Sequence, residues 1–201
     1  SMYITNNASI GLHHVNHHIY NFGSVTLFFG MGTVEKVAVV EKGEARMKRF
    51  LPIGTAEHPF AGTLTGNDHA LSNLTVERGN EGYAALIAYA SATSRIEGVR
   101  LMAPRVTATG PYVAALVART DGVIANCEVR KATVGSDYLY VAPLAGHATK
   151  VENCHVYLSQ VAGTAGCVSG MVAELDSSMT NCGASDNIIY SGATRQMDVS
   201  G

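Results

Sequence analysis

Four histidines within six residues are the first feature of this 201-residue sequence that could do chemistry. They are His13, His14, His17 and His18 of the segment HHVNHH. Residues four apart share one face of a helix, so two pairs of imidazoles could face a common Zn²⁺, Ni²⁺ or Cu²⁺ ion if the segment is helical. Because no acid or cysteine stands beside them, the alternative is a polar cap over an open end of the fold. We predict no cofactor.

Two glutamates are the candidate carboxylate pair. Glu97 and Glu152 fall at equivalent positions of a repeat described below, two repeats apart. If each repeat is one coil of a stack, they lie about 9.6 Å apart, near the upper limit for the acid and base of an inverting glycosidase. Ala125 takes the position between them and Glu35 repeats it upstream, so a solubilising column of outward carboxylates is the favoured interpretation.

A thiol and two aromatic rings complete the candidates. Cys167 lies outside the repeated cysteines and is the thiol to test for reactivity, although a buried small residue is the favoured interpretation. Tyr138 and Tyr157 lie near expected turns, where an exposed ring could stack on a sugar, whereas most other tyrosines are expected to pack beside the core. Neither a Gly-x-Ser-x-Gly nor a His-Glu-x-x-His motif occurs, so the sequence favours a non-enzymatic protein.

A sequence repeat indicates which structural elements position these residues. The dipeptide Asn-Cys occurs three times, at Asn126-Cys127, Asn153-Cys154 and Asn181-Cys182, with spacings of 27 and 28 residues. Aligning on it extends the repeat back to RIEGVRL, with Gly98 in the asparagine position, and to ALSNLTV, with Asn73 there. Some ten residues before each later asparagine position stands a small-residue apolar run: AALIA, AALVA, APLAG and SGMVA. Two landmarks that recur together indicate a repeat architecture.

Each unit contains short β-prone runs separated by turn formers, and helical spacing of apolar residues is not sustained. Such a unit cannot bury its apolar face alone, whereas stacked units can pair every strand with its equivalents above and below. The sequence therefore predicts an all-β fold, a right-handed parallel β-helix of about five or six coils. Stacking predicts a structural ladder of Asn73, Asn126, Asn153 and Asn181, and a core column of Cys127, Cys154 and Cys182. Side chains one coil apart lie too far apart for an unstrained disulfide, so we expect free thiols.

These motifs resemble the GLUG-motif repeat family of bacterial surface and secreted proteins. Its repeats read small-Leu-apolar-small, a variable turn, and then Ile-x-Asn-Cys with alternating apolar residues. The small apolar runs and the Asn-Cys pairs match this pattern, and the lead-in FLPIGTAEHPFAGTLTGNDHALSNLTV is similar to the segment that commonly precedes such repeats. The resemblance covers about residues 50–189 and, weakly, 24–39. It implies an extracellular adhesin or scaffold, and it carries over no catalytic residue.

The composition of the chain limits the classes of partner that it could bind. A net charge of -2 and the lack of a basic run argue against nucleic acid as a partner. The sequence has no run of about eighteen apolar residues, so it predicts no helix that spans a membrane. We expect an irregular first coil and cap over 1–49 and the repeat β-helix over 50–201, together one domain of a larger protein. The expected function is a secreted or cell-surface adhesin or spacer that binds glycans or host matrix proteins. The alternative is a carbohydrate-active β-helix or the accessory part of a secreted hydrolase. An uncapped last coil could pair with another chain, which leaves the oligomeric state open.

Overall fold

The computed structural model describes residues 50–67 and 69–192, and the backbone of five further strands. Four of these strands precede the repeats: β1 (Met2–Asn6), β2 (Leu27–Met31), β3 (Ala38–Glu41) and β4 (Glu44–Met47). The first two pair in parallel, and the second two form an antiparallel hairpin. The fifth, β21 (Thr194–Met197), follows the repeats. The four clustered histidines and Glu35 lie outside the described residues.

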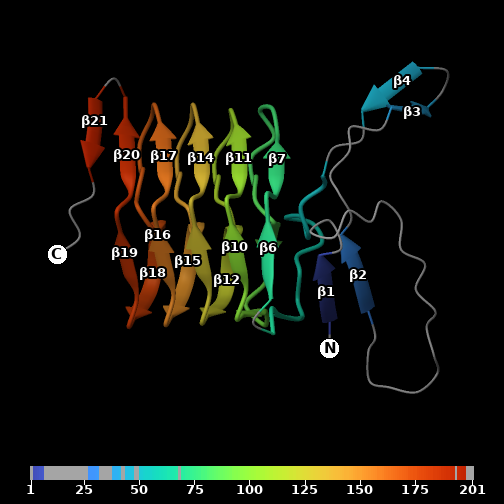
Figure 1. Ribbon diagram of the computed structural model, residues 1–201, viewed down its shortest axis with the longest axis horizontal. Coiled ribbons are helices and arrows are strands. Elements are labelled where there is room, and N and C mark those ends of the chain that lie inside the picture. Colours follow the sequence, from blue (N-terminus) through green and yellow to red (C-terminus); the bar gives the residue numbers. More distant parts are fainter. Residues whose placement is uncertain are drawn as a thin grey trace.

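Three parallel sheets run along the body of the molecule, and each successive coil adds one layer to them (Figure 1). Sheet 1 contains β5 (Thr63–Thr65), β8 (Ile87–Ala90), β9 (Arg95–Glu97), β12 (Val117–Ala125), β15 (Ala145–Glu152) and β18 (Val172–Thr180). Sheet 2 contains β6 (Ala70–Ser72), β10 (Arg100–Met102), β13 (Glu128–Arg130), β16 (His155–Tyr157) and β19 (Gly183–Ser185). Sheet 3 contains β7 (Thr75–Glu77), β11 (Arg105–Ala108), β14 (Thr133–Ser136), β17 (Gln160–Gly163), β20 (Ile188–Ser191) and the antiparallel β21. The described residues therefore form the predicted parallel β-helix. Each coil contributes one strand to sheet 2, and the five strands of this sheet correspond to five coils.

The core consists of apolar columns that run along the coil axis. Alternate residues of each short strand point inward, and the register places inward residues of successive coils above one another. Leu64, Ile96, Ile124 and Val151 form such a column in sheet 1, and all four are fully buried. Sheets 2 and 3 have equivalent columns of leucine and valine. Because each unit buries its apolar residues only against its neighbours, no unit is a core by itself.

Left-handed residues make the corners between sheets. The corner between sheets 1 and 2 has Gly98, Asn126, Asn153 and Asn181, with φ of 62°, 53°, 52° and 52°. Glycine and asparagine enter this region most readily, which explains why the repeat keeps them there. The side-chain amide of Asn181 donates to the amide oxygen of Asn153 at 2.7 Å, so the last two members of the predicted ladder are hydrogen-bonded.

Asn73 does not belong to this ladder, so its alignment was wrong. The register pairs Ala70 with Arg100 and Ser72 with Met102, which places Asn73 in line with Ala103 at the corner between sheets 2 and 3. Both corners need a left-handed residue before an apolar strand, so a single Asn-Leu pair fits either pattern. The equivalent of Gly98 in the preceding coil is Gly66, whose backbone N–H donates to Glu97 just as that of Gly98 donates to Ala125.

The cysteine column has a polar role in addition to its packing role. Cys127 and Cys154 are buried and free, and Cys182 is free and half-buried in the last coil. Each thiol donates to the carbonyl two residues before it, and the backbone N–H of Cys127 donates to the sulfur of Cys154 at 3.4 Å. A thiol here fills a small core position and also satisfies the backbone at a sharp corner.

Candidate ligand-binding groove

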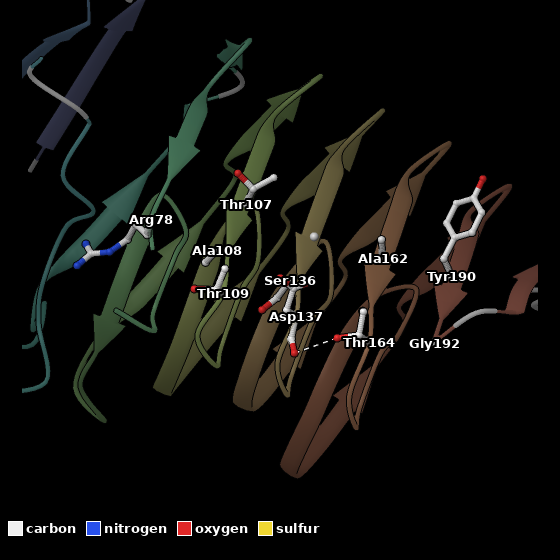
Figure 2. A pocket seen from close by; sticks show the side chains of 12 residues that line it. Arg78, Thr107, Ala108, Thr109, Ser136, Asp137, Ala162, Thr164, Tyr190 and Gly192 are labelled. Atoms are coloured by element: carbon white, nitrogen blue, oxygen red, sulfur yellow. Dashed lines mark hydrogen bonds between the residues drawn. The ribbon is translucent and has the colours of Figure 1, made fainter. Parts of the chain in front are cut away.

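A groove of about 380 Å³ lies on the outward face of sheet 3 and crosses several coils. Figure 2 shows that its lining side chains come from successive coils, from Arg78 after β7 at one end to Tyr190 on β20 at the other. Four coil steps separate these ends, which at the strand spacing of a sheet is about 19 Å. The groove therefore has the volume of a small-molecule site and the length of an extended ligand.

Small residues make the groove hollow. The register places Thr107, Gly135, Ala162 and Tyr190 in one outward column of sheet 3. Gly135 has no side chain, and Ala162 adds one methyl group, so the floor is lowest between the threonine and the tyrosine. A Cβ added at Gly135 would meet nothing closer than the Ala162 carbonyl at 3.8 Å, so packing does not require glycine there.

The loops that form one edge of the groove are tied from coil to coil. The buried hydroxyl of Ser136 donates to the Gly110 carbonyl at 2.8 Å, and it accepts the backbone N–H of Tyr138 at 3.1 Å. In the next coil, the Thr164 hydroxyl donates to the Asp137 carbonyl at 2.9 Å (Figure 2). These bonds hold the edge in place before any ligand arrives.

The polar groups of the groove suit a ligand rich in hydroxyl groups. Thr107, Thr109, Asp137 and Thr164 are exposed and supply hydroxyls and one carboxylate. Tyr190 is half-buried and closes one end with an aromatic ring. At the other end Arg78 forms an ion pair with Glu81, and its buried Nε has no hydrogen-bond partner. Asp137 is the one carboxylate among the described residues that line the groove.

The two tyrosines predicted as a ligand face lie on different surfaces. Tyr138 is 49% exposed and sits beside the groove, next to Asp137. Tyr157 lies on sheet 2, where the guanidinium of Arg130 covers its ring at 4.5 Å from the centroid. The structure therefore does not bring them together into one stacking face.

A stack of three tyrosines is the largest feature that the sequence analysis missed. Tyr83, Tyr112 and Tyr140 are left-handed residues at the corner before sheet 1, with φ of 62°, 58° and 64°. Their rings stack along the axis with centroids 5.3 Å and 4.7 Å apart. Tyr83 and Tyr112 pack against the buried Ala85, Ala114 and Ala118, which explains why the repeat keeps small residues in these runs. The signal was present, because each tyrosine stands one or two residues before a small-residue run.

Charged side chains surround this stack and pair with one another, although the buried Nε of Arg119 and the buried Nδ1 of His147 have no hydrogen-bond partner. The guanidinium of Arg119 lies over the rings of Tyr89 and Tyr112, at 5.6 Å and 5.8 Å from the centroids. The Tyr89 hydroxyl donates to Asp121 at 2.8 Å, and this bond together with burial raises the pKa of Tyr89. In the next coil, Nε2 of the buried His147 lies 3.0 Å from an Asp176 carboxylate oxygen. The cluster is a stabilising network rather than an open site.

The glutamate pair occupies the predicted column but not a catalytic environment. The register places Glu97, Ala125 and Glu152 in line. Each glutamate has its own cation, because Arg95 contacts Glu97 at 2.5 Å and Lys150 contacts Glu152 at 2.7 Å. The hydrogen bond from Lys150 lowers the pKa of Glu152, whereas a general acid needs a raised pKa. This geometry favours the solubilising column.

The remaining candidates are a thiol and metal ligands. Cys167 is exposed, contrary to the buried position that the sequence favoured. It follows Tyr140 in the column of the tyrosine stack, because Val141 pairs with Val168. Among the described residues, no three His, Cys, Asp or Glu side chains cluster to hold a metal ion.

The same part of the chain contains no helix with the length and apolarity that a membrane crossing requires.

Comparisons with known proteins find one short similarity. A stretch of 57 residues, 27% of this chain, is 44% identical to part of Halomucin from Haloquadratum walsbyi (strain DSM 16790 / HBSQ001). The chain spans about 1% of the length of that protein. No family model matches the chain. No solved structure matches it either.

Proposed function

We propose that this protein is a non-enzymatic, extracellular binding module, and that the groove on sheet 3 holds an extended glycan. The observation that carries the proposal is the groove itself, which combines a floor of small residues with exposed hydroxyls and an aromatic end. A sugar has polar edges and an apolar C–H face, so hydroxyls and a carboxylate can orient it while a tyrosine ring packs against that face.

The placement of acids favours binding over cleavage. Most glycosidases use two carboxylates that flank the scissile bond. Within the described lining of the groove, Asp137 is the sole carboxylate, and the paired glutamates lie on sheet 1, each beside its own cation. The hydrolase alternative rests on the alignment of Glu97 and Glu152 alone. It predicts that a Glu97→Gln/Glu152→Gln variant abolishes glycan cleavage.

Two further observations support the extracellular part of the proposal. The Asn-Cys corners and small-residue runs are the features that resemble GLUG-motif repeats of bacterial surface proteins, and we propose membership of that family. The match to Halomucin has the length of about two coils, which suits a module that recurs within a much longer protein.

A glycan array with the labelled 201-residue chain tests the proposal. We expect saturable binding without new products by mass spectrometry. Gly135→Leu fills the floor of the groove at a position with room for the side chain, so it should weaken binding at least tenfold. Thr133→Leu is the matched control, because Thr133 lies on the same strand and outside the groove lining.

Three results would overturn the proposal. The first is no saturable binding to any glycan, and the second is equal loss of binding in both leucine variants. The third is the appearance of cleaved products, which would favour the hydrolase alternative and direct attention to Glu97 and Glu152.

A further inference from the structure

The groove on sheet 3 offers a ligand the same two rows of contacts in each coil that it crosses. The floor column contributes one residue per coil, in the order Thr107, Gly135, Ala162 and Tyr190. The edge row consists of the residues that directly follow β11, β14, β17 and β20, namely Thr109, Asp137, Thr164 and Gly192. Successive members of a row come from successive coils (Figure 2), so they are about 4.8 Å apart.

This period discriminates between polymers. A chain stays in step with the two rows only if its repeat unit is about as long as one coil step. An extended peptide advances about 3.3–3.6 Å per residue and a polyproline helix about 3.1 Å, so a peptide is out of step after one or two coils. A pyranose ring linked through opposite carbons adds a length close to one coil step. The four coil steps of the groove then hold about four or five sugar units.

The charges of the groove favour an uncharged chain. Arg78 is the one cation among the described residues of the lining, and it already forms an ion pair with Glu81. Figure 2 shows that its side chain points away from Thr107 and the later coils. Asp137 lies within the edge row, where it would repel a chain with an anionic group on every unit. The same carboxylate accepts hydrogen bonds from neutral hydroxyl groups.

We infer that the ligand of this groove is a linear, uncharged polysaccharide that lies along the coil axis with one sugar unit per coil. The inference rests on the glycan-binding function proposed for the same groove. Hydroxyl groups of successive units meet Thr109, Asp137 and Thr164, and the Tyr190 ring packs against the unit at the last coil. Each added unit gains another row of contacts on a surface that is already formed, so affinity increases until the groove is full.

Titration calorimetry of the whole chain with cello-, manno- and xylo-oligosaccharides of increasing length tests the inference. For at least one series we expect the dissociation constant to fall at least tenfold from the disaccharide to the pentasaccharide, and to level off beyond about five units. Oligogalacturonates of equal length are the charged probe and should bind at least tenfold more weakly.

Two variants locate the chain in the groove. Tyr190→Ala removes the contact at the last coil, so affinity should level off about one unit earlier. Asp137→Asn removes the negative charge, so it should reduce the discrimination against oligogalacturonates at least threefold. Arg105→Gln is the matched control, because Arg105 is exposed on the same face of sheet 3 but lies outside the lining, and both properties should stay unchanged. Circular dichroism checks that each variant is folded.

The possible failures are distinguishable. If no glycan of any kind binds, the proposed function fails and the inference fails with it. If the chain binds glycans but affinity does not depend on length, or charged chains bind more tightly than neutral ones, the inference alone is overturned. Equal effects of Tyr190→Ala and Arg105→Gln on the length dependence would also overturn it.

Discussion

The tyrosine stack should be a main source of stability at its corner, and Tyr112 tests this because it is the middle ring. Tyr112→Ala removes two stacking contacts, each worth about 0.5–1.5 kcal/mol. It also removes the contact with the Arg119 guanidinium, worth about 0.5–1 kcal/mol. We expect the free energy of unfolding to fall by about 1.5–4 kcal/mol.

The left-handed backbone at Tyr112 gives a second test, because it should reverse the usual order of stability of alanine and glycine. In an ordinary strand, glycine is less stable than alanine by about 0.5–1 kcal/mol. Here φ is 58°, where a residue with a Cβ is less stable by about 1–2 kcal/mol. Tyr112→Gly should therefore be more stable than Tyr112→Ala, by about 0.5–1 kcal/mol. Tyr112→Phe keeps both ring contacts and should lose less than about 0.5 kcal/mol.

Urea unfolding followed by circular dichroism measures these differences. Tyr138→Ala is the control, because this ring is 49% exposed and lies outside the stack, and it should change stability by less than about 0.5 kcal/mol. The reasoning fails if Tyr112→Phe loses as much as Tyr112→Ala, or if the alanine variant is as stable as the original chain. It also fails if alanine is more stable than glycine.

Three further predictions concern thiols, alkaline pH and the asparagine corner. A thiol reagent should modify the exposed Cys167 quickly, but Cys127 and Cys154 only after unfolding; modification of all thiols at one rate would contradict this. The raised pKa of Tyr89 favours the neutral phenol in the fold, so the contribution of Tyr89 to the free energy of unfolding should be fully present below about pH 10 and be lost as pH rises further; a flat profile in alkaline urea titrations would refute this. Asn153→Gly should cost about 0.5–1.5 kcal/mol in urea unfolding through its lost amide bond, and Asn153→Ala more; the reverse order would count against the left-handed strain.

Much of the coil architecture follows from the sequence because its causes are local. The corner between sheets 1 and 2 has Gly or Asn in the left-handed region, and a short strand with one buried face needs alternating apolar residues; both recur with the coil length. Asn126, Asn153 and Asn181, which the repeat aligned, therefore all lie at this one corner. Asn73 misled because two corners of one coil have the same requirement, and only the pairing of neighbouring strands distinguishes them.

The groove and the tyrosine stack depend on relations that a single repeat does not contain. The groove is hollow because Gly135 and Ala162 fall in one column between Thr107 and Tyr190, which requires the register of four coils. The stack requires tyrosine in a backbone region that a bulky residue rarely enters, so local propensity argues against it. Likewise, the reversal at β21 breaks the repeat and could not be extrapolated from it.

The direction of the hydrogen bonds has a mechanical consequence. Strands run across the coil axis, so the bonds that join one coil to the next point along it. A pull on the two ends of the stack loads these bonds in series, and the weakest junction between coils opens before the others. A pull along the strands would instead load all the bonds of a junction together in shear. If this protein is tethered at its ends, it should yield to force stepwise, by the length of one coil at a time.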